Sequence, residues 1–219
     1  MDPMRQTAEL LDRVRAALRG RTVAEPGLPY VAPREPGAPG SAQGRIDLFR
    51  RKFEALGGTF LAGPAAESVI PALGELLRAE GVTALFFPEE DPASRSLADA
   101  LVPFGPFLLV SPADIRQAEP PVSAGIQSAE FAIAESGTIV QTSRGGTSLW
   151  PGLASDVHVC LLSPDRFLDG MEDCLEALSG DPPRSISLIT GPSRTADIEL
   201  TLTMGVHGPR RVIAVLPSS

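Results

Sequence analysis

The segment VTALFFPEEDPASRSLADALVPFGPFLLV, residues 82–110, decides the fold class. It begins with the apolar run 82–87 and ends with the apolar run 107–110, and such short runs are typical of strands buried on both faces of a sheet. Between them, Asp91-Pro92 provides a helix N-cap followed by proline at the first helical position, which predicts a helix that continues to Leu101. A strand, a helix and a strand in this order predict a βαβ unit with parallel strands.

The alternation of strands and helices continues on both sides of this segment. A helix is predicted to start at Arg45 and end before Gly57, because its apolar residues recur with a period of 3.6. Another is expected from about Ser68 to Glu80, with Pro71 in its first turn. Towards the C-terminus we expect a strand at 157–162, a helical region at 163–180, and strands at 186–190 and 211–216.

The middle of the chain departs from this alternation. Residues 131–135 and 138–142 predict two strands, and Ser136-Gly137 between them predicts a tight turn. The fold class is therefore α/β, with a mixed, mainly parallel sheet, flanking helices and a β-hairpin. Ligands of open α/β sheets bind at the carboxyl ends of strands, near breaks in strand order.

Two parts are expected along the chain, residues 1–44 and an α/β domain over residues 45–219. In the first part, Leu11, Val14 and Leu18 form a narrow apolar stripe that predicts a short helix ending at Gly20. Residues 21–44 contain five prolines and four glycines, too many for a regular element. This stretch is a linker or surface loop, or an arm that packs on a partner subunit.

Composition limits the function classes. The formal net charge of −8 disfavours binding to nucleic-acid phosphates. The two cysteines, Cys160 and Cys174, cannot alone supply the four ligands of a typical zinc or iron–sulfur site, and the two histidines lack metal-ligand spacing, so we expect no metal or cofactor in this chain. The charged N-terminus lacks a signal peptide's apolar stretch, and no apolar run reaches the roughly 18 residues of a membrane span, so we expect a cytoplasmic protein.

The densest chemical signal is TGPSRTADIE at 190–199. We expect a helix to begin at Pro192 or Ser193, with Ser193 or Thr195 capping free N–H groups and the turn at Gly191 holding an anion. Arg194 would add a bidentate donor for a carboxylate or phosphate. Strict apolar–polar alternation from 198 to 206 favours a strand instead, but a helix would complete the connection to the last strand. The alternative is a capped turn with a solvated arginine.

Three other places carry candidate groups. Glu135, at the hairpin corner, is a candidate nucleophile or general base, or it only accepts hydrogen bonds from turn N–H groups. Gly137 and Thr138 beside it, and His207 between two nearby glycines, are candidate ligand-binding residues. The loop RGGTSLWP at 144–151 suits a lid, because adjacent glycines give conformational freedom, or it is a plain surface loop.

Three motifs together resemble a known family: AESGT at 134–138, GPSRTADIE at 191–199 and GVHGP at 205–209. They are similar to the lactate utilization protein C family, whose module is called the LUD domain, and the resemblance runs from about residue 45 to residue 216. It implies a fold like those of ribose-phosphate isomerases and CoA transferases. It also implies a role in oxidising L-lactate to pyruvate with two iron–sulfur partner subunits.

Two functional hypotheses follow. In the first, the chain is a non-redox subunit of an iron–sulfur L-lactate oxidation system and binds a small carboxylate or the partner subunits. In the second, it is a free-standing transferase or isomerase of a small anionic metabolite, with Glu135 as nucleophile or base and Arg194 holding the anion. A third hypothesis is a ligand-sensing module without catalysis.

Overall fold

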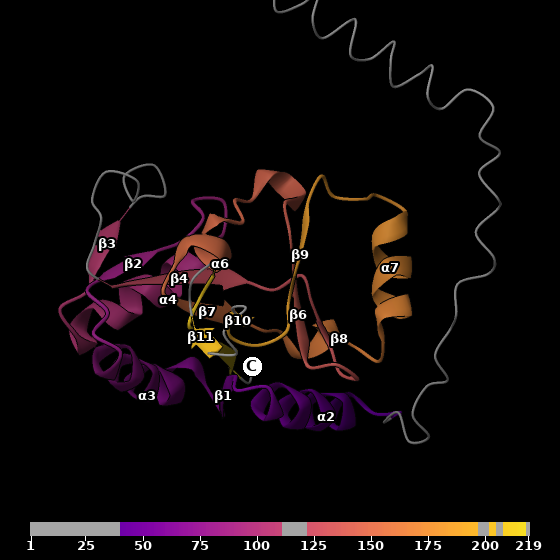
Figure 1. The fold of residues 1–219 in the computed structure, drawn as a ribbon, viewed down its shortest axis with the longest axis horizontal. Coiled ribbons are helices and arrows are strands. Elements are labelled where there is room, and N and C mark those ends of the chain that lie inside the picture. Colours follow the sequence, from indigo (N-terminus) through magenta and orange to yellow (C-terminus); the bar gives the residue numbers. More distant parts are fainter. Residues whose placement is uncertain (1–39, 111–121, 197–201, 205–207, 218–219) are drawn as a thin grey trace, which may run out of the picture. The chain divides into compact units, whose positions relative to one another are not determined.

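A computed structural model describes residues 40–110, 122–196, 202–204 and 208–217 (Figure 1). The centre is a six-stranded sheet with the order β1-β12-β7-β4-β2-β3, in which each strand is parallel to its neighbours. Its strands are β1 (Thr59–Gly63), β2 (Ala84–Phe86), β3 (Leu108–Val110), β4 (Ser123–Ser128), β7 (Val157–Leu161) and β12 (Arg211–Pro217). The predicted α/β class with a mainly parallel sheet is confirmed. The predicted helix and most of the arm in residues 1–44 lie outside the described residues.

The predicted hairpin is confirmed, and it belongs to a second sheet. Strands β5 (Phe131–Ile133) and β6 (Thr138–Thr142) are antiparallel, and the turn between them contains Gly137 with φ of 67°. This sheet has the order β8-β5-β6-β9 and is completed by β8 (Phe167–Leu168) and β9 (Ile186–Ile189). In Figure 1 it stands to the right of the six-stranded sheet.

Helices α3 (Ala66–Ala79) and α4 (Pro92–Leu101) cover one face of the six-stranded sheet. The core between them is aliphatic and fully buried, with Leu73, Leu77 and Leu101 against Leu85, Ile126, Val159 and Ile213. The helix predicted from Asp91-Pro92 is confirmed, since the Asp91 side chain accepts a hydrogen bond from the Ser94 N–H at 3.1 Å. Helix α3 begins before the predicted start, so Pro71 lies inside the helix.

The other face of the six-stranded sheet packs against helix α2 (Ala42–Ala55) and the second sheet. An aromatic cluster fills this layer: Phe49 stacks on Phe53 with ring centroids 5.3 Å apart and meets the edge of Phe167 at 5.4 Å. Helix α2 begins three residues before the predicted start because Ser41 is its N-cap and accepts a hydrogen bond from the Gly44 N–H at 3.1 Å.

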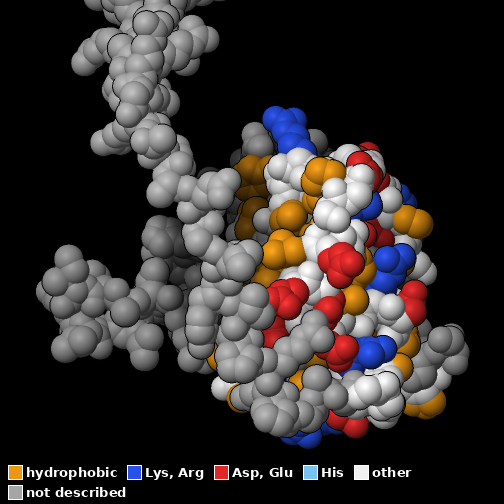
Figure 2. Space-filling model, turned by 90° about the vertical axis from the view of Figure 1, so that its right-hand side faces the viewer, with side chains coloured by type: hydrophobic (Ala, Val, Ile, Leu, Met, Phe, Trp, Pro, Cys, Tyr) orange, Lys and Arg blue, Asp and Glu red, His pale blue; other side chains and the backbone are white. Residues whose placement is uncertain are grey.

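Helix α7 (Met171–Ser179) covers the far face of the second sheet, where Cys174 and Leu178 contact Phe131, Ile133 and Val140. The single helical region predicted at 163–180 is wrong in its first half. A short 3₁₀ turn, η3 (Pro164–Arg166), and strand β8 occupy that half, and α7 starts only after Gly170, whose N–H donates to Asp173 Oδ2 at 2.9 Å. On the face that Figure 2 shows, acidic side chains lie among hydrophobic and basic ones.

The helix predicted after Gly191 is also wrong. Residues Arg194–Ala196 form strand β10, which pairs antiparallel with β11 (Leu202–Met204). The period-two alternation of apolar and polar residues therefore decides the local structure here. The remaining elements are the 3₁₀ turns η1 (Val102–Phe104) and η2 (Arg144–Gly146) and the short helix α6 (Trp150–Ala154). Among the described residues, no helix is long and apolar enough to cross a membrane.

Candidate functional site

A pocket of about 210 Å³ lies beyond the carboxyl ends of β2 and β4, next to the end of β6. This is the position at which open α/β sheets bind their ligands. Both sheets contribute to its wall. The lining residues are Glu90, Asp91, Pro92, Ser128, Ala129, Glu130, Thr142, Arg144 and Thr147.

Asp91 fixes one wall of the pocket. Its buried carboxylate caps α4 and also accepts hydrogen bonds from the Ser128 N–H at 2.8 Å and the Ser128 hydroxyl at 3.0 Å. The Ser94 hydroxyl donates to it as well. Because these donors already occupy both carboxylate oxygens, Asp91 ties the start of α4 to the end of β4 and is not available to a ligand.

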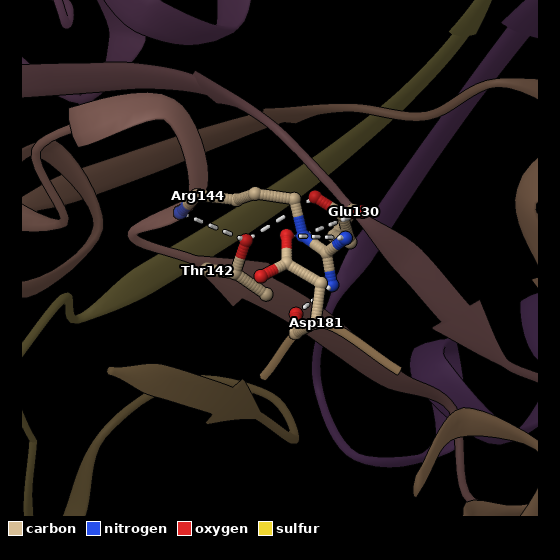
Figure 3. Close-up of polar contacts among 4 residues, drawn as sticks. All are labelled: Glu130, Thr142, Arg144 and Asp181. Carbon is tan, nitrogen blue, oxygen red and sulfur yellow. Dashed lines mark hydrogen bonds and ion pairs between the residues drawn. The ribbon is translucent and has the colours of Figure 1, made fainter. Parts of the chain in front are cut away.

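Arg144 is the cation of the pocket, and Figure 3 shows its partners. Its Nη2 donates to the Asp181 carbonyl at 2.9 Å, and its Nη1 lies 3.6 Å from Asp181 Oδ2. On the other side, its Nε lies 3.8 Å from Glu130 Oε1, too far for a hydrogen bond. The buried Nε has no hydrogen-bond partner in the part of the chain that the structure describes.

Thr142 connects this group to the end of β6. Its hydroxyl donates to Glu130 Oε2 at 3.2 Å and accepts from the Arg144 backbone N–H at 3.3 Å. The Arg144 guanidinium therefore lies between the Glu130 carboxylate, which lines the pocket, and the Asp181 carboxylate at the surface. The Asp181 side chain is 84% exposed, and such pairs contribute at most about 1 kcal/mol. Another carboxylate can therefore take the place of Asp181 at Arg144.

Gly137 and Gly191, both predicted ligand-binding residues, lie beside the C-terminal half of α2. A Cβ at Gly137 would stand 2.5 Å from the Phe53 backbone nitrogen, and one at Gly191 would stand 3.1 Å from the Leu56 carbonyl oxygen. Both glycines have positive φ, 67° and 90°. Close approach of backbone to backbone, together with this conformation, explains both glycines without a ligand.

Thr138 and Glu135 also have structural contacts. The Thr138 hydroxyl lies 2.9 Å from the Thr190 hydroxyl and accepts from the Ser136 hydroxyl at 2.7 Å. Glu135 is exposed, and its Oε1 accepts a hydrogen bond from the Met171 N–H at 2.9 Å, at the start of α7. This contact matches the alternative in which Glu135 only satisfies backbone N–H groups. Neither residue lines the pocket.

The structure contradicts the anion-binding helix predicted around Ser193, Arg194 and Thr195. Ser193 donates its backbone N–H to the Pro209 carbonyl at 2.8 Å, and Arg194 and Thr195 lie in strand β10. A strand has no row of free N–H groups at its start, so the predicted mode of anion binding is lost. His207 lies outside the described residues.

A buried polar group lies between the two sheets. His158 on β7 is fully buried, and Gln141 Nε2 on β6 lies 3.0 Å from its Nε2. Burial lowers the pKa of His158 from 6.5 to about 4, so the imidazole is neutral near pH 7. Burial also raises the pKa of the Cys160 thiol. In the described ranges, no three residues of the types that bind metals come together as a metal site.

The sequence reasoning missed most of the pocket. It singled out Arg144 only as the start of a candidate lid, and it did not consider Glu130 and Thr142. Glu130 follows β4, a strand that the sequence did not predict, and Asp181 is distant in sequence. The sequence signal that could have identified Glu130 is a charged residue just beyond the end of a strand, had β4 been predicted.

Comparisons with known proteins agree with the fold. Residues 110–216 match the model of the LUD domain family. The chain is 31% identical over 137 residues to lactate utilization protein C of Deinococcus radiodurans, covering 57% of this chain and 63% of that one. It is 37% identical over 98 residues to lactate utilization protein C of an Exiguobacterium strain, covering 42% and 43%.

Two further matches are a curated relative and a solved structure. An uncharacterized protein of Neisseria meningitidis, NMB1437, is 35% identical over 101 residues, covering 44% of this chain and 43% of that one. The matches thus span from under half to less than two thirds of these relatives. A solved structure of a DUF162 family protein from Deinococcus radiodurans has a TM-score of 0.55 and 20% identity, covering 81% of this chain and 99% of that one, which supports the fold alone.

Proposed function

We propose that the chain is a non-redox subunit of a lactate utilization system that binds a small carboxylate beside Arg144; its residues 110–216 match the model of the LUD domain family. Relatives named lactate utilization protein C support the pathway. The observation that carries the proposal is the pocket at the carboxyl ends of β2 and β4, with the guanidinium of Arg144, whose buried Nε has no hydrogen-bond partner among the described residues.

The pocket suits a small 2-hydroxy or 2-oxo acid. The ligand carboxylate replaces the exposed Asp181 carboxylate at Arg144 and accepts hydrogen bonds from the guanidinium, which binds carboxylates in a planar, bidentate way. Glu130 and Thr142 then supply an acceptor and a hydroxyl for the second polar group of the ligand. Because Glu90, Asp91 and Glu130 also line the pocket, an anion binds there only through Arg144.

The electron chemistry of lactate oxidation is assigned to partner subunits. The chain has two cysteines, fewer than an iron–sulfur cluster needs, and both are buried thiols. In this proposal iron–sulfur clusters reside in the partners, and the chain holds the carboxylate or organises the assembly. Glu135 lies outside the pocket, so nothing in the site favours the transferase or isomerase hypothesis.

Binding of L-lactate and pyruvate to the purified protein tests the ligand. Loss of charge-assisted hydrogen bonds costs about 1.5–3 kcal/mol, so Arg144→Gln should weaken binding roughly 10- to 100-fold by calorimetry. Asp181→Asn should strengthen it, because the competing carboxylate is gone. Arg95→Gln is the matched control, since Arg95 pairs on the surface of α4 with Asp99. Equal affinity of the Arg144→Gln variant and the unaltered protein would contradict the proposal.

Growth on lactate tests the pathway. Deletion of the gene should abolish growth on L-lactate, and the unaltered gene should restore it while Arg144→Gln should not. The native protein should also co-purify with cysteine-rich iron–sulfur proteins. Normal growth of the deletion strain on lactate would contradict the role in lactate utilization. It would not affect the test of carboxylate binding at Arg144.

A further inference from the structure

The pocket at the carboxyl ends of β2 and β4 contains more acceptors of hydrogen bonds than donors. Three of its lining residues are acidic, Glu90, Asp91 and Glu130, and one, Arg144, is basic. A carboxylate only accepts hydrogen bonds and a guanidinium only donates them. The groups that remain available to a ligand therefore decide which small carboxylic acids the pocket can hold.

Several donors in the pocket wall are already bonded within the protein. The Ser128 hydroxyl donates to Asp91 Oδ1 at 3.0 Å, and the Thr142 hydroxyl donates to Glu130 Oε2 at 3.2 Å. The hydroxyl of Thr147, which also lines the pocket, can donate or accept, so it accommodates either kind of ligand group. The wall residues whose backbone N–H groups are bonded to other protein atoms are Ser128, Ala129, Glu130, Arg144 and Thr147. The guanidinium is therefore the main donor that these residues offer a ligand.

Glu130 is the acceptor beside that donor. Its Oε1 lies 3.8 Å from Arg144 Nε, too far for a hydrogen bond, whereas its Oε2 already accepts from the Thr142 hydroxyl. Oε1 therefore keeps the capacity to accept a hydrogen bond from a ligand. The two atoms are close enough that neighbouring groups on one small molecule reach both, one accepting from Nε and the other donating to Oε1. A carboxylate and a hydroxyl on adjacent carbon atoms form such a pair.

We propose that Glu130 makes the pocket selective for 2-hydroxy acids over the corresponding 2-oxo acids; this inference rests on the proposed binding of a carboxylate at Arg144. The 2-hydroxyl group donates to Glu130 Oε1 while the ligand carboxylate accepts from Arg144. The oxygen of a 2-oxo group only accepts, so it faces the Glu130 carboxylate with no proton between them. Thr142 supplies that proton only by giving up its own hydrogen bond to Glu130, which leaves an acceptor unpaired at a cost.

Calorimetric titration of the full chain with L-lactate, pyruvate and propionate tests this selectivity. A hydrogen bond to a charged group is strong enough that L-lactate should bind roughly 10- to 100-fold more tightly than pyruvate. Propionate has the same carboxylate and no oxygen at the 2-position. It should therefore bind more weakly than L-lactate, because it makes no hydrogen bond to Glu130, but no more weakly than pyruvate, because it brings no second acceptor.

Glu130→Gln is the decisive variant. Its amide oxygen still accepts from the Thr142 hydroxyl, which places the NH₂ group where Oε1 lies in the unaltered protein. An amide NH₂ group donates to a 2-oxo oxygen and cannot accept from a 2-hydroxyl, so the ratio of L-lactate to pyruvate affinity should fall roughly tenfold or more. Glu90→Gln is the matched control, since it removes the same charge at an exposed residue that lines the pocket. It should change both affinities alike and leave the ratio unchanged.

Three results would overturn the selectivity while leaving carboxylate binding intact. They are equal affinities of the unaltered protein for L-lactate and pyruvate, an unchanged affinity ratio in Glu130→Gln, and an equal fall of the ratio in Glu90→Gln. Failure of the proposed function looks different, because then none of the three acids binds, or each binds Arg144→Gln as tightly as the unaltered protein; either result also removes the selectivity. If Glu130→Gln does not fold, the comparison of the three acids on the unaltered protein decides by itself.

Discussion

Acidification should destabilise the protein through His158. In the folded protein, burial lowers the pKa of this histidine from 6.5 to about 4. Above pH 6.5 both the folded and the unfolded states carry a neutral His158, and the full stability is present. Between pH 6.5 and pH 4 the unfolded state binds a proton that the folded state does not bind, so stability falls as the pH falls. Below about pH 4 both states are protonated and this loss ends.

The size of the loss follows from the difference between the two pKa values. Each unit corresponds to about 1.4 kcal/mol, so complete acidification through this window should lower the free energy of unfolding by about 3 kcal/mol. For a domain whose stability is of the order of 5–15 kcal/mol, such a loss is readily measured.

Urea denaturation at a series of pH values from 7.5 to about 4.5 measures this effect, with His158→Gln as the comparison. The variant lacks the titrating group, whereas the contributions of all other ionisable groups are common to both proteins and cancel in the difference. The unaltered protein should lose about 2–3 kcal/mol more than the variant across this range. Parallel pH profiles of the two proteins would refute a neutral, buried His158.

Further substitutions test contacts described above. Gly137→Ala should lower the free energy of unfolding by about 2–4 kcal/mol, because it combines left-handed strain with a Cβ 2.5 Å from the Phe53 nitrogen. Gly145→Ala is the control and should cost only about 1 kcal/mol, because Gly145 has φ of 65° but open space around it. Equal costs of the two substitutions in thermal unfolding would contradict the packing argument. Asp91→Ala should lower the free energy of unfolding by about 2–4 kcal/mol, since it removes the cap of α4 and the acceptor of the Ser128 N–H. Asp91→Asn should cost less. A cost of Asp91→Ala below about 0.5 kcal/mol in urea denaturation would show that Asp91 does not join α4 to β4. Glu135→Gln should leave stability within about 0.5 kcal/mol, because the amide oxygen still accepts from the Met171 N–H, whereas loss of an enzymatic activity at unchanged melting temperature would return Glu135 to a catalytic role.

The elements that the sequence predicted well carry their signals locally. Helix α4 has its N-cap and its first-turn proline in adjacent positions, Asp91 and Pro92, so its start is readable without tertiary information. Strands β7 and β12 are predominantly apolar, as expected for strands buried on both faces. The hairpin of β5 and β6 is predicted from the glycine in its turn, Gly137.

The elements that were missed depend on distant partners. Strand β4 has the sequence SAGIQS, and its small residues weaken any strand pattern. Gly125 is required there because the Pro151 carbonyl of α6 packs against it, a contact that local sequence cannot reveal. The contacts in the pocket could not be predicted for the same reason, because Arg144 meets the sequence-distant Glu130 and Asp181 only when the strands have assembled.

The position of β12 has a consequence for the synthesis of the protein. This strand lies between β1 and β7, and β1, at the edge of the sheet, has β12 as its neighbour, with Thr59 aligned to Ile213. During translation, β1 emerges early and must wait for nearly the whole domain before it can pair. Such long-range pairing slows folding and leaves strand edges exposed in the meantime. A nascent chain stalled before residue 211 should therefore be a strong client of ribosome-associated chaperones.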